Sequence, residues 1–268
     1  MVTRACWLCD FAVGACVFND LVTVHDLIRR LPDPDALKAR CRAFAVLDAV
    51  FDSGYPTYTF TPGWGGSGVD LAQMDNGSGD LYAIVFEQAG VFLYGFDHES
   101  EVSPWRDDDH EHWPGLLQGL PESLAKWTRE PAFLFQDFFD ATICVWRETA
   151  DTEWRHGPVE FDDGDADFDG ANNLFGALAA GDAHAYATYA TDYFEQEVDV
   201  AAVAAVLAGA VLTEEVVHAL NPEAAFAEVV RAAAKAGYPV TTRSWSVRGV
   251  VQIDSGSGPS CGLEILSG

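Results

Sequence analysis

Residues Met74–Pro104 have the sequence MDNGSGDLYAIVFEQAGVFLYGFDHESEVSP, in which two apolar runs flank a short turn. The runs Leu81–Phe86 and Val91–Phe96 are rich in β-branched and aromatic residues, which favour strands. Glu87–Gly90 joins them through a glycine-containing turn, and this pattern is typical of a β-hairpin. An Asn-Gly-Ser-Gly-Asp turn precedes the hairpin, and a polar cluster, Asp97–Ser100, follows it. We therefore look for a functional site at this edge of a sheet.

Apolar residues recur at helical spacing elsewhere in the chain. The clearest case runs from Leu37 to Phe51, where Asp33 suits the N-cap and Pro34 the first helical position. The same pattern predicts helices over Asn19–Arg30, over Pro114–Trp127 and over most of the chain after Asn172, where Asn221 and Pro222 open the last helix. Further strands are predicted at Tyr55–Phe60, Ala141–Trp146, Pro158–Phe161 and within Val240–Ile253.

These elements predict an α+β fold, with a mixed or antiparallel sheet packed by helices and a C-terminal half that is mainly helical. The chain has no internal repeat and no long linker, so residues 1–268 are expected to form a single domain. Within it, residues 1–18 form an apolar N-terminal segment, and residues 255–268 form a Gly- and Ser-rich, flexible tail.

Charge is the most extreme global property of the sequence. Lys and Arg number 15 against 42 Asp and Glu, which gives a net charge of −27. Such a surface repels phosphate backbones and anionic membranes, so neither nucleic acid nor a membrane is an expected partner. Three interpretations stay open: adaptation to high salt, complementarity to a basic protein such as a nuclease toxin, and mimicry of DNA.

The N-terminal segment and the cysteines favour a cytoplasmic protein. No run of 18 apolar residues is present, and Asp10 interrupts the apolar stretch that a secretory signal would need. Cys6 and Cys9 form a CxxC pair without a second pair, so free thiols in a reducing compartment are the simpler interpretation. A zinc site that adds Cys16 and His25 is the alternative.

Two further segments could bind metals. The run Trp105–His112 contains His110 and His112 among carboxylates, which are zinc ligands but also typical of a solvated acidic loop. Asp165, Asp167 and Asp169 match the first half of a calcium loop, D-x-D-x-D-G. The twelfth position of that loop is Gly176 instead of Glu, and the alternative is a turn in which Asp169 or its neighbours cap a helix beginning near Ala171. We expect no cofactor, with calcium or zinc as alternatives.

The candidate site after the hairpin consists of carboxylates and one histidine: Asp75, Asp80, Asp97, His98 and Glu99. On an extended segment Asp97 and Glu99 would share a face, with His98 opposite. Neighbouring carboxylates could bind a cation or share a proton, or they could simply tie down the turn after the strand. No nucleophile elbow, phosphate loop or dinucleotide fingerprint is present, which favours a protein that is not an enzyme.

The turn Asn76–Asp80, the two strands after it and the final Asp97-His98-Glu99 resemble the core of the SUKH superfamily. That resemblance implies an α+β protein, and many members are immunity proteins that bind and neutralise toxins. The chain is longer than a typical member. Gly95–Pro104, with Leu220-Asn221-Pro222 and Gly237-Tyr238-Pro239, is also similar to uncharacterised bacterial proteins, which implies no activity.

The sequence thus predicts a non-enzymatic, protein-binding module of the immunity type. A metal-dependent hydrolase that uses Asp97, His98 and Glu99 with His110 or His112 is the first alternative. An acidic DNA mimic is the second.

Overall fold

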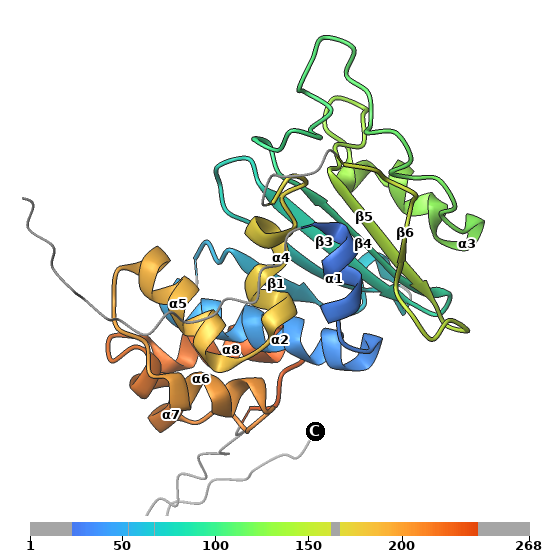
Figure 1. Cartoon of the computed structure of the whole chain (residues 1–268). Coiled ribbons are helices and arrows are strands. Elements are labelled where there is room, and N and C mark those ends of the chain that lie inside the picture. Colours follow the sequence, from blue (N-terminus) through green and yellow to red (C-terminus); the bar gives the residue numbers. More distant parts are fainter. Residues whose placement is uncertain (1–22, 53, 67, 162–166, 241–268) are drawn as a thin grey trace, which may run out of the picture.

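The computed structural model of the chain describes residues 23–52, 54–66, 68–161 and 167–240 (Figure 1). In this part of the chain, six strands form one sheet in sequence order, and each strand is antiparallel to the next. The strands are β1 (Tyr58–Thr61), β2 (Asp70–Asp75), β3 (Leu81–Glu87), β4 (Gly90–Phe96), β5 (Ile143–Glu148) and β6 (Arg155–His156). The α+β fold is confirmed, and the sheet is antiparallel throughout.

Helices precede and follow the sheet in the chain. They are α1 (Val24–Arg30), α2 (Pro34–Phe51), α3 (Glu122–Ala125), α4 (Ala171–Ala180), α5 (Ala183–Phe194), α6 (Val200–Leu207), α7 (Glu214–Leu220) and α8 (Phe226–Lys235), with short 3-10 turns η1 (Trp64–Gly66), η2 (Lys126–Arg129) and η3 (Pro131–Phe133). The described C-terminal half is mainly helical, as predicted. Among the described residues, none of these helices has both the length and the apolar character that a membrane crossing requires.

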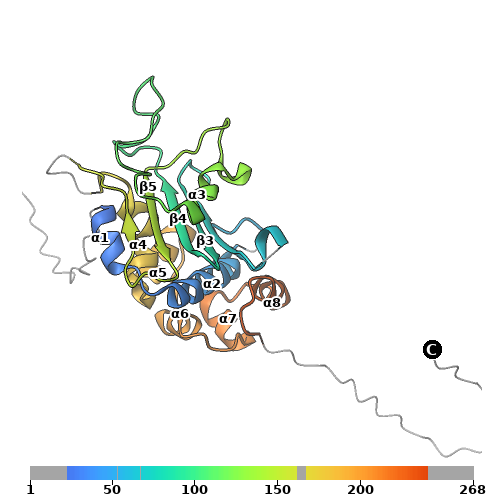
Figure 2. The same ribbon diagram turned by 90° about the vertical axis from the view of Figure 1, so that its right-hand side faces the viewer.

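All the helices except α3 form a layer on one face of the sheet (Figure 2). Helices α1, α2 and α4 pack directly against strands, while α5, α6 and α8 pack on α2, and α7 contacts α6 and α8. Figure 2 shows α1 and α4 on one side of β3–β5 and α3 on the other. Because α3 and its neighbouring turns cover the second face, every residue of β4 is buried.

The predicted hairpin is confirmed and places the candidate site. Strands β3 and β4 pair from Leu81 opposite Phe96 to Glu87 opposite Gly90. Gly95 lies on the helix-facing side of β4, where a Cβ atom would come within 2.7 Å of Leu174 and 2.9 Å of Phe175. This small residue therefore lets α4 approach the end of β4, next to the polar cluster.

Two predictions of local structure were wrong, and one strand was not predicted. The helix predicted over Pro114–Trp127 is reduced to α3 and η2, because Gly115 and Gly119 adopt positive φ angles that end any helix there. The strand predicted at Pro158–Phe161 is irregular, and the neighbouring Arg155–His156 pairs with β5 instead. Strand β2 was not predicted, although it pairs with both β1 and β3.

Other boundaries shifted or fall outside the described residues. Helix α8 begins at Phe226, because Asn221 accepts from the Glu223 N–H and caps a turn instead of the helix. Of the predicted strand region Val240–Ile253, only Val240 is described, and it forms a single bridge with Leu212. The N-terminal segment, the tail and the cysteines of the proposed zinc set lie outside the described residues. Among the described residues, Cys41 and Cys144 are buried free thiols.

Candidate functional site: a carboxylate–histidine cluster beside an aromatic pocket

The turn before β3 holds Asp80 in place through its own side chains. Asp75 Oδ1 accepts from the Gly77 N–H at 2.8 Å, and Asn76 Oδ1 accepts from the backbone N–H groups of Ser78 (2.8 Å) and Asp80 (3.2 Å). The Asn76 amide also donates to Asp80 Oδ2 at 2.8 Å. Asx-type bonds of this kind fix a tight turn, and here they fix the Asp80 carboxylate as well.

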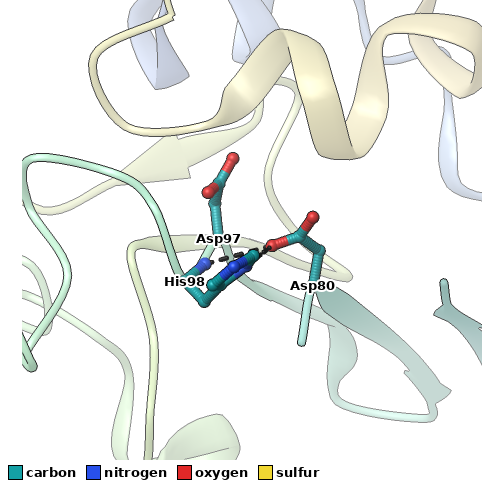
Figure 3. Close-up of side chains that lie close together, drawn as sticks. All are labelled: Asp80, Asp97 and His98. Atoms are coloured by element: carbon teal, nitrogen blue, oxygen red, sulfur yellow. Dashed lines mark hydrogen bonds and ion pairs between the residues drawn. The ribbon is translucent and has the colours of Figure 1, made fainter. Parts of the chain in front are cut away.

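Asp80 and His98 form a close pair across the hairpin (Figure 3). Asp80 Oδ1 lies 2.7 Å from His98 Nδ1 and 3.1 Å from the His98 backbone nitrogen. The hydrogen bond to Asp80 raises the pKa of His98 above its ordinary value. Partial burial alone would raise the pKa of Asp80, but hydrogen bonds from His98, Asn76 and Asn173 outweigh it and lower that pKa. Gly79 accommodates the imidazole, since a Cβ there would lie 3.3 Å from His98 Cγ.

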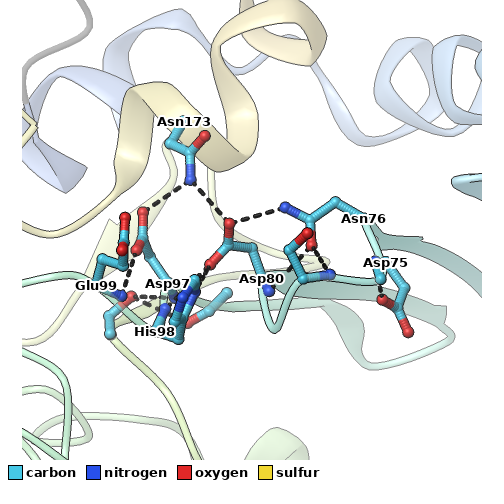
Figure 4. A network of polar contacts seen from close by, with 11 residues as sticks. Asp75, Asn76, Asp80, Asp97, His98, Glu99 and Asn173 are labelled. Carbon is cyan, nitrogen blue, oxygen red and sulfur yellow. Dashed lines mark hydrogen bonds and ion pairs between the residues drawn. The ribbon is translucent and has the colours of Figure 1, made fainter. Parts of the chain in front are cut away.

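Helix α4 joins this pair to Asp97 through one side-chain amide. The Asn173 Nδ2 group donates to Asp97 Oδ2 at 2.9 Å and to Asp80 Oδ2 at 3.3 Å (Figure 4). Asp97 Oδ1 accepts from the backbone N–H of Glu99 at 3.0 Å. The cluster therefore connects the turn before β3, the end of β4 and the first turn of α4.

The acidic run before α4 caps that helix. Asp167 accepts from the backbone N–H groups of Asn172 (2.6 Å) and Asn173 (2.8 Å). Asp169 accepts from the N–H groups of Ala171 (3.1 Å) and Val24 (2.7 Å), which also ties α1 to α4. Burial raises the pKa of both carboxyls, to about 7 for Asp169. The predicted capping role is confirmed for these two aspartates, and Asp165 of the predicted calcium loop lies outside the described residues.

Asp80, Asp97 and His98 are the described residues whose arrangement could hold a metal ion. One ligand atom from each lies within 4.8 Å of the others, and carboxylate and imidazole groups suit a divalent cation. Four protein donors, however, already occupy Asp80, two on each oxygen. Glu99 and Asp75 do not belong to this group: Glu99 is exposed, and Asp75 caps the turn.

His110 and His112 do not join that cluster, so the predicted metal set that combined either of them with Asp97–Glu99 is not formed among the described residues. His110 Nε2 lies 3.2 Å from Asp140 Oδ1, and its ring contacts the Trp105 ring at a tilt, with centroids 3.9 Å apart. His112 Nε2 lies 2.5 Å from the Phe139 carbonyl oxygen, and burial lowers its pKa. Both histidines have structural contacts within the loops that cover the second face of the sheet.

Next to the cluster lies an apolar cavity of about 470 Å³, here called the aromatic pocket. His98 and Gly79 form one edge of it, so the polar cluster and the pocket share a boundary. Its wall consists mainly of Tyr94, Phe96, Trp105, Phe133 and Phe135, with Asp140 as the carboxylate among them. Trp105 and Phe135 are 47% and 56% exposed, and their ring centroids are 6.2 Å apart.

Sequence reasoning found Asp80, Asp97 and His98 but missed Asn173 and the pocket. Asn173 is 76 residues from Asp97 in the chain, and no local pattern links the two. In the aromatic run Phe133–Phe139, Phe133 and Phe139 are buried but Phe135 is exposed, and the sequence pattern does not distinguish them. The polar residues that follow Phe135, Gln136 and Asp137, adopt positive φ angles, which turn the chain at the surface.

No protein-family model, no curated protein and no solved structure matches the chain. The resemblance to the SUKH superfamily therefore stays a prediction based on the hairpin alone.

Proposed function

We propose that this chain is a protein-binding module of the immunity type, which neutralises a basic protein by stoichiometric contact. The observation that carries the proposal is the pair of exposed aromatic residues, Trp105 and Phe135, at the mouth of the aromatic pocket. Exposed aromatic residues around a pocket are typical of the energetically dominant centre of a protein interface.

The surroundings of this pair carry negative charge. Asp107, Asp108 and Asp109 follow Trp105 in the chain and are exposed, and so is Asp137 beside Phe135. An apolar centre with a charged rim is the usual anatomy of such an interface. A net charge of −27 would attract a basic partner and speed its association. The SUKH-like hairpin is the reason to expect a toxin as that partner.

The hydrogen bonds of the polar cluster support a structural role beside the interface. Asp80 accepts from Asn76 within its own turn, from His98 after β4 and from Asn173 in α4. A general base or a metal ligand would need a carboxylate with free lone pairs. Both carboxylate oxygens of Asp80 already accept hydrogen bonds from the protein, and these bonds fix the positions of the side chains in the cluster.

The test is affinity capture of the tagged chain from its native host at moderate salt, followed by mass spectrometry. We expect one basic protein near one-to-one with the chain. The double variant Trp105→Ser/Phe135→Ser should bind this partner about 30-fold or more weakly, because it removes the centre of the interface. Tyr55→Ser is the matched control, because Tyr55 is 91% exposed and precedes β1, outside the pocket wall. Capture that is equal for all variants would refute the proposal.

A metal-dependent hydrolase is the second candidate, because Asp80, Asp97 and His98 lie close together; a metal ion there would have to replace some of the protein donors on Asp80. It predicts stoichiometric metal in the purified protein and loss of hydrolysis in His98→Ala with the fold intact. A folded wild-type protein that retains no metal after incubation with zinc or manganese would exclude this candidate.

A further inference from the structure

The aromatic pocket contains one carboxylate, Asp140, and one histidine as its basic group. Its aromatic wall surrounds Asp140, and its lining includes neither Lys nor Arg. The one titratable base in the lining is His98, whose Nδ1 already contacts Asp80. No Lys or Arg pairs with this carboxylate, and the one charged partner it could have among the described residues is His110, at Oδ1.

Asp140 is buried, and only one of its two carboxylate oxygens makes hydrogen bonds with described residues. Oδ1 accepts from Trp105 Nε1 at 3.1 Å and lies 3.2 Å from His110 Nε2. Within the described part of the chain, nothing donates to Oδ2. The Tyr94 hydroxyl makes no hydrogen bond with another described residue either, and burial together with the nearby Asp140 charge raises its pKa, so it keeps its proton.

The chemistry that would satisfy this site is cationic. The faces of Trp, Tyr and Phe rings attract an ammonium or guanidinium group, and the attraction grows as water is removed. A carboxylate oxygen supplies a charge-assisted hydrogen bond to the same group. Asp107–Asp109 are exposed and follow Trp105 and Arg106 in the chain. Although Arg106 pairs with Asp107, the net charge of this segment is negative, which favours a cation further. A neutral apolar group would fill the volume but leave Asp140 Oδ2 without a partner.

We propose that the aromatic pocket receives a lysine or arginine side chain of the protein partner, with Asp140 as its counter-ion and the aromatic wall around its stem. This inference rests on the proposed function, because it names the group of the basic partner that enters the pocket. Trp105 reports on the site directly, since its indole N–H donates to Asp140.

The test uses n-butylammonium as a lysine side-chain probe and 1-butanol as its neutral counterpart. The readout is the indole N–H resonance of Trp105 in the ¹⁵N-labelled chain, assigned by its loss in Trp105→Phe. We expect saturable shifts with n-butylammonium, with a dissociation constant on the order of millimolar for so small a ligand. 1-Butanol should bind at least about tenfold more weakly, and Asp140→Asn should weaken n-butylammonium binding by a similar factor.

Phe135→Leu gives an independent check, because Phe135 is exposed and its replacement spares the core. It should weaken n-butylammonium binding several-fold and leave 1-butanol binding nearly unchanged. Equal binding of both probes, or no saturable shift with n-butylammonium, would overturn the inference. If a partner is captured equally well by wild type and Asp140→Asn, the inference fails while the proposed function stands. If n-butylammonium binds but no partner is captured, the proposed function fails and the cation site stands.

Discussion

Gly170 and Asp97 lie so close together that a Cβ atom on Gly170 would be 2.4 Å from the Cβ of Asp97. Gly170 also has a φ of 79°, a conformation that residues with side chains rarely adopt. These two features place the N-terminus of α4 directly against the end of β4. The position of Asn173, and with it the whole polar cluster, depends on this contact.

Gly170→Ala should therefore destabilise the protein strongly. Left-handed backbone costs about 1 kcal/mol for a residue with a Cβ, and overpacking against Asp97 adds about 1–3 kcal/mol. Gly209→Ala is the matched control, since Gly209 has a φ of 76° and nothing within 4 Å of its Cβ position. Chemical denaturation should show a loss of about 2–4 kcal/mol for the first variant and about 1 kcal/mol for the second. Equal losses would show that the contact with Asp97 is not tight.

Asn173→Ala should cost about 1–3 kcal/mol of unfolding free energy, because the side chain donates to two aspartates and its loss leaves Asp97 Oδ2 without a described partner. Asn172→Ala is the control: Asn172 occupies the preceding exposed position in the same helix. The control should change stability by less than about 0.5 kcal/mol. If both variants behave alike in denaturant, the bridge between α4 and the two strands contributes nothing.

Asp48, on the buried face of α2, gives the fold a pH dependence. It accepts from the Tyr58 N–H at 3.1 Å, and burial raises its pKa to about 7, against an ordinary value of 3.8. The folded state therefore holds a proton that the unfolded state releases, so this group destabilises the fold as pH rises from about 4 to about 7. The effect amounts to at most about 4 kcal/mol.

Asp48→Asn should remove this dependence. Relative to wild type, the variant should be more stable at pH 8 than at pH 5, as measured by urea denaturation at both values. Asp169 has the same raised pKa of about 7 and remains in both proteins, so only the difference between them isolates Asp48. A difference that does not change with pH would contradict the assignment.

His25 and His156 couple α1 to β6 through neutral imidazoles. His156 Nδ1 donates to the Gly157 carbonyl oxygen at 2.5 Å, which leaves Nε2 to accept from His25 Nδ1 at 3.2 Å. Burial lowers the pKa of both histidines. Their contribution to stability is thus complete above the unfolded pKa of 6.5, and it is lost as pH falls below 6.5 through the lowered folded values.

His25→Phe keeps a ring in contact with Phe161 but cannot be protonated. Its stability relative to wild type should rise as pH falls from 7.5 to about 5, as followed by melting temperature. A constant difference over this range would show that His25 has the same pKa in the folded and unfolded states, which would contradict its burial against His156.

The sequence predicted the parts of this fold that depend on neighbours in the chain. The β3–β4 hairpin and the helix after Pro34 follow from local patterns, and so does the cap before α4. Strand β2 was missed because Asp70–Asp75 contains no β-branched or aromatic residue and is stabilised by its two neighbouring strands. The apolar spacing in Pro114–Trp127 is helical, but Gly115 and Gly119 interrupt the helix with positive φ angles. Gly115 also lies directly against the backbone of Pro158.

The residues of the candidate site also fall into two groups: those that the local sequence predicts and those that only the tertiary structure brings together. Asp80, Asp97 and His98 come from one hairpin, so their proximity could be inferred from pairing alone. Asn173 and Asp140 reach this region from distant elements, and the exposure of Trp105 and Phe135 depends on how the covering loops fold. Only tertiary structure shows that the polar cluster borders an aromatic pocket.

The most direct test of protein binding through this pocket is calorimetric titration of the purified chain with its captured partner. We predict a one-to-one complex whose affinity falls by about 30-fold or more in Trp105→Ser/Phe135→Ser and is unchanged in Tyr55→Ser. A complex of the same affinity with all three proteins, or no complex with any of them, would contradict the central claim.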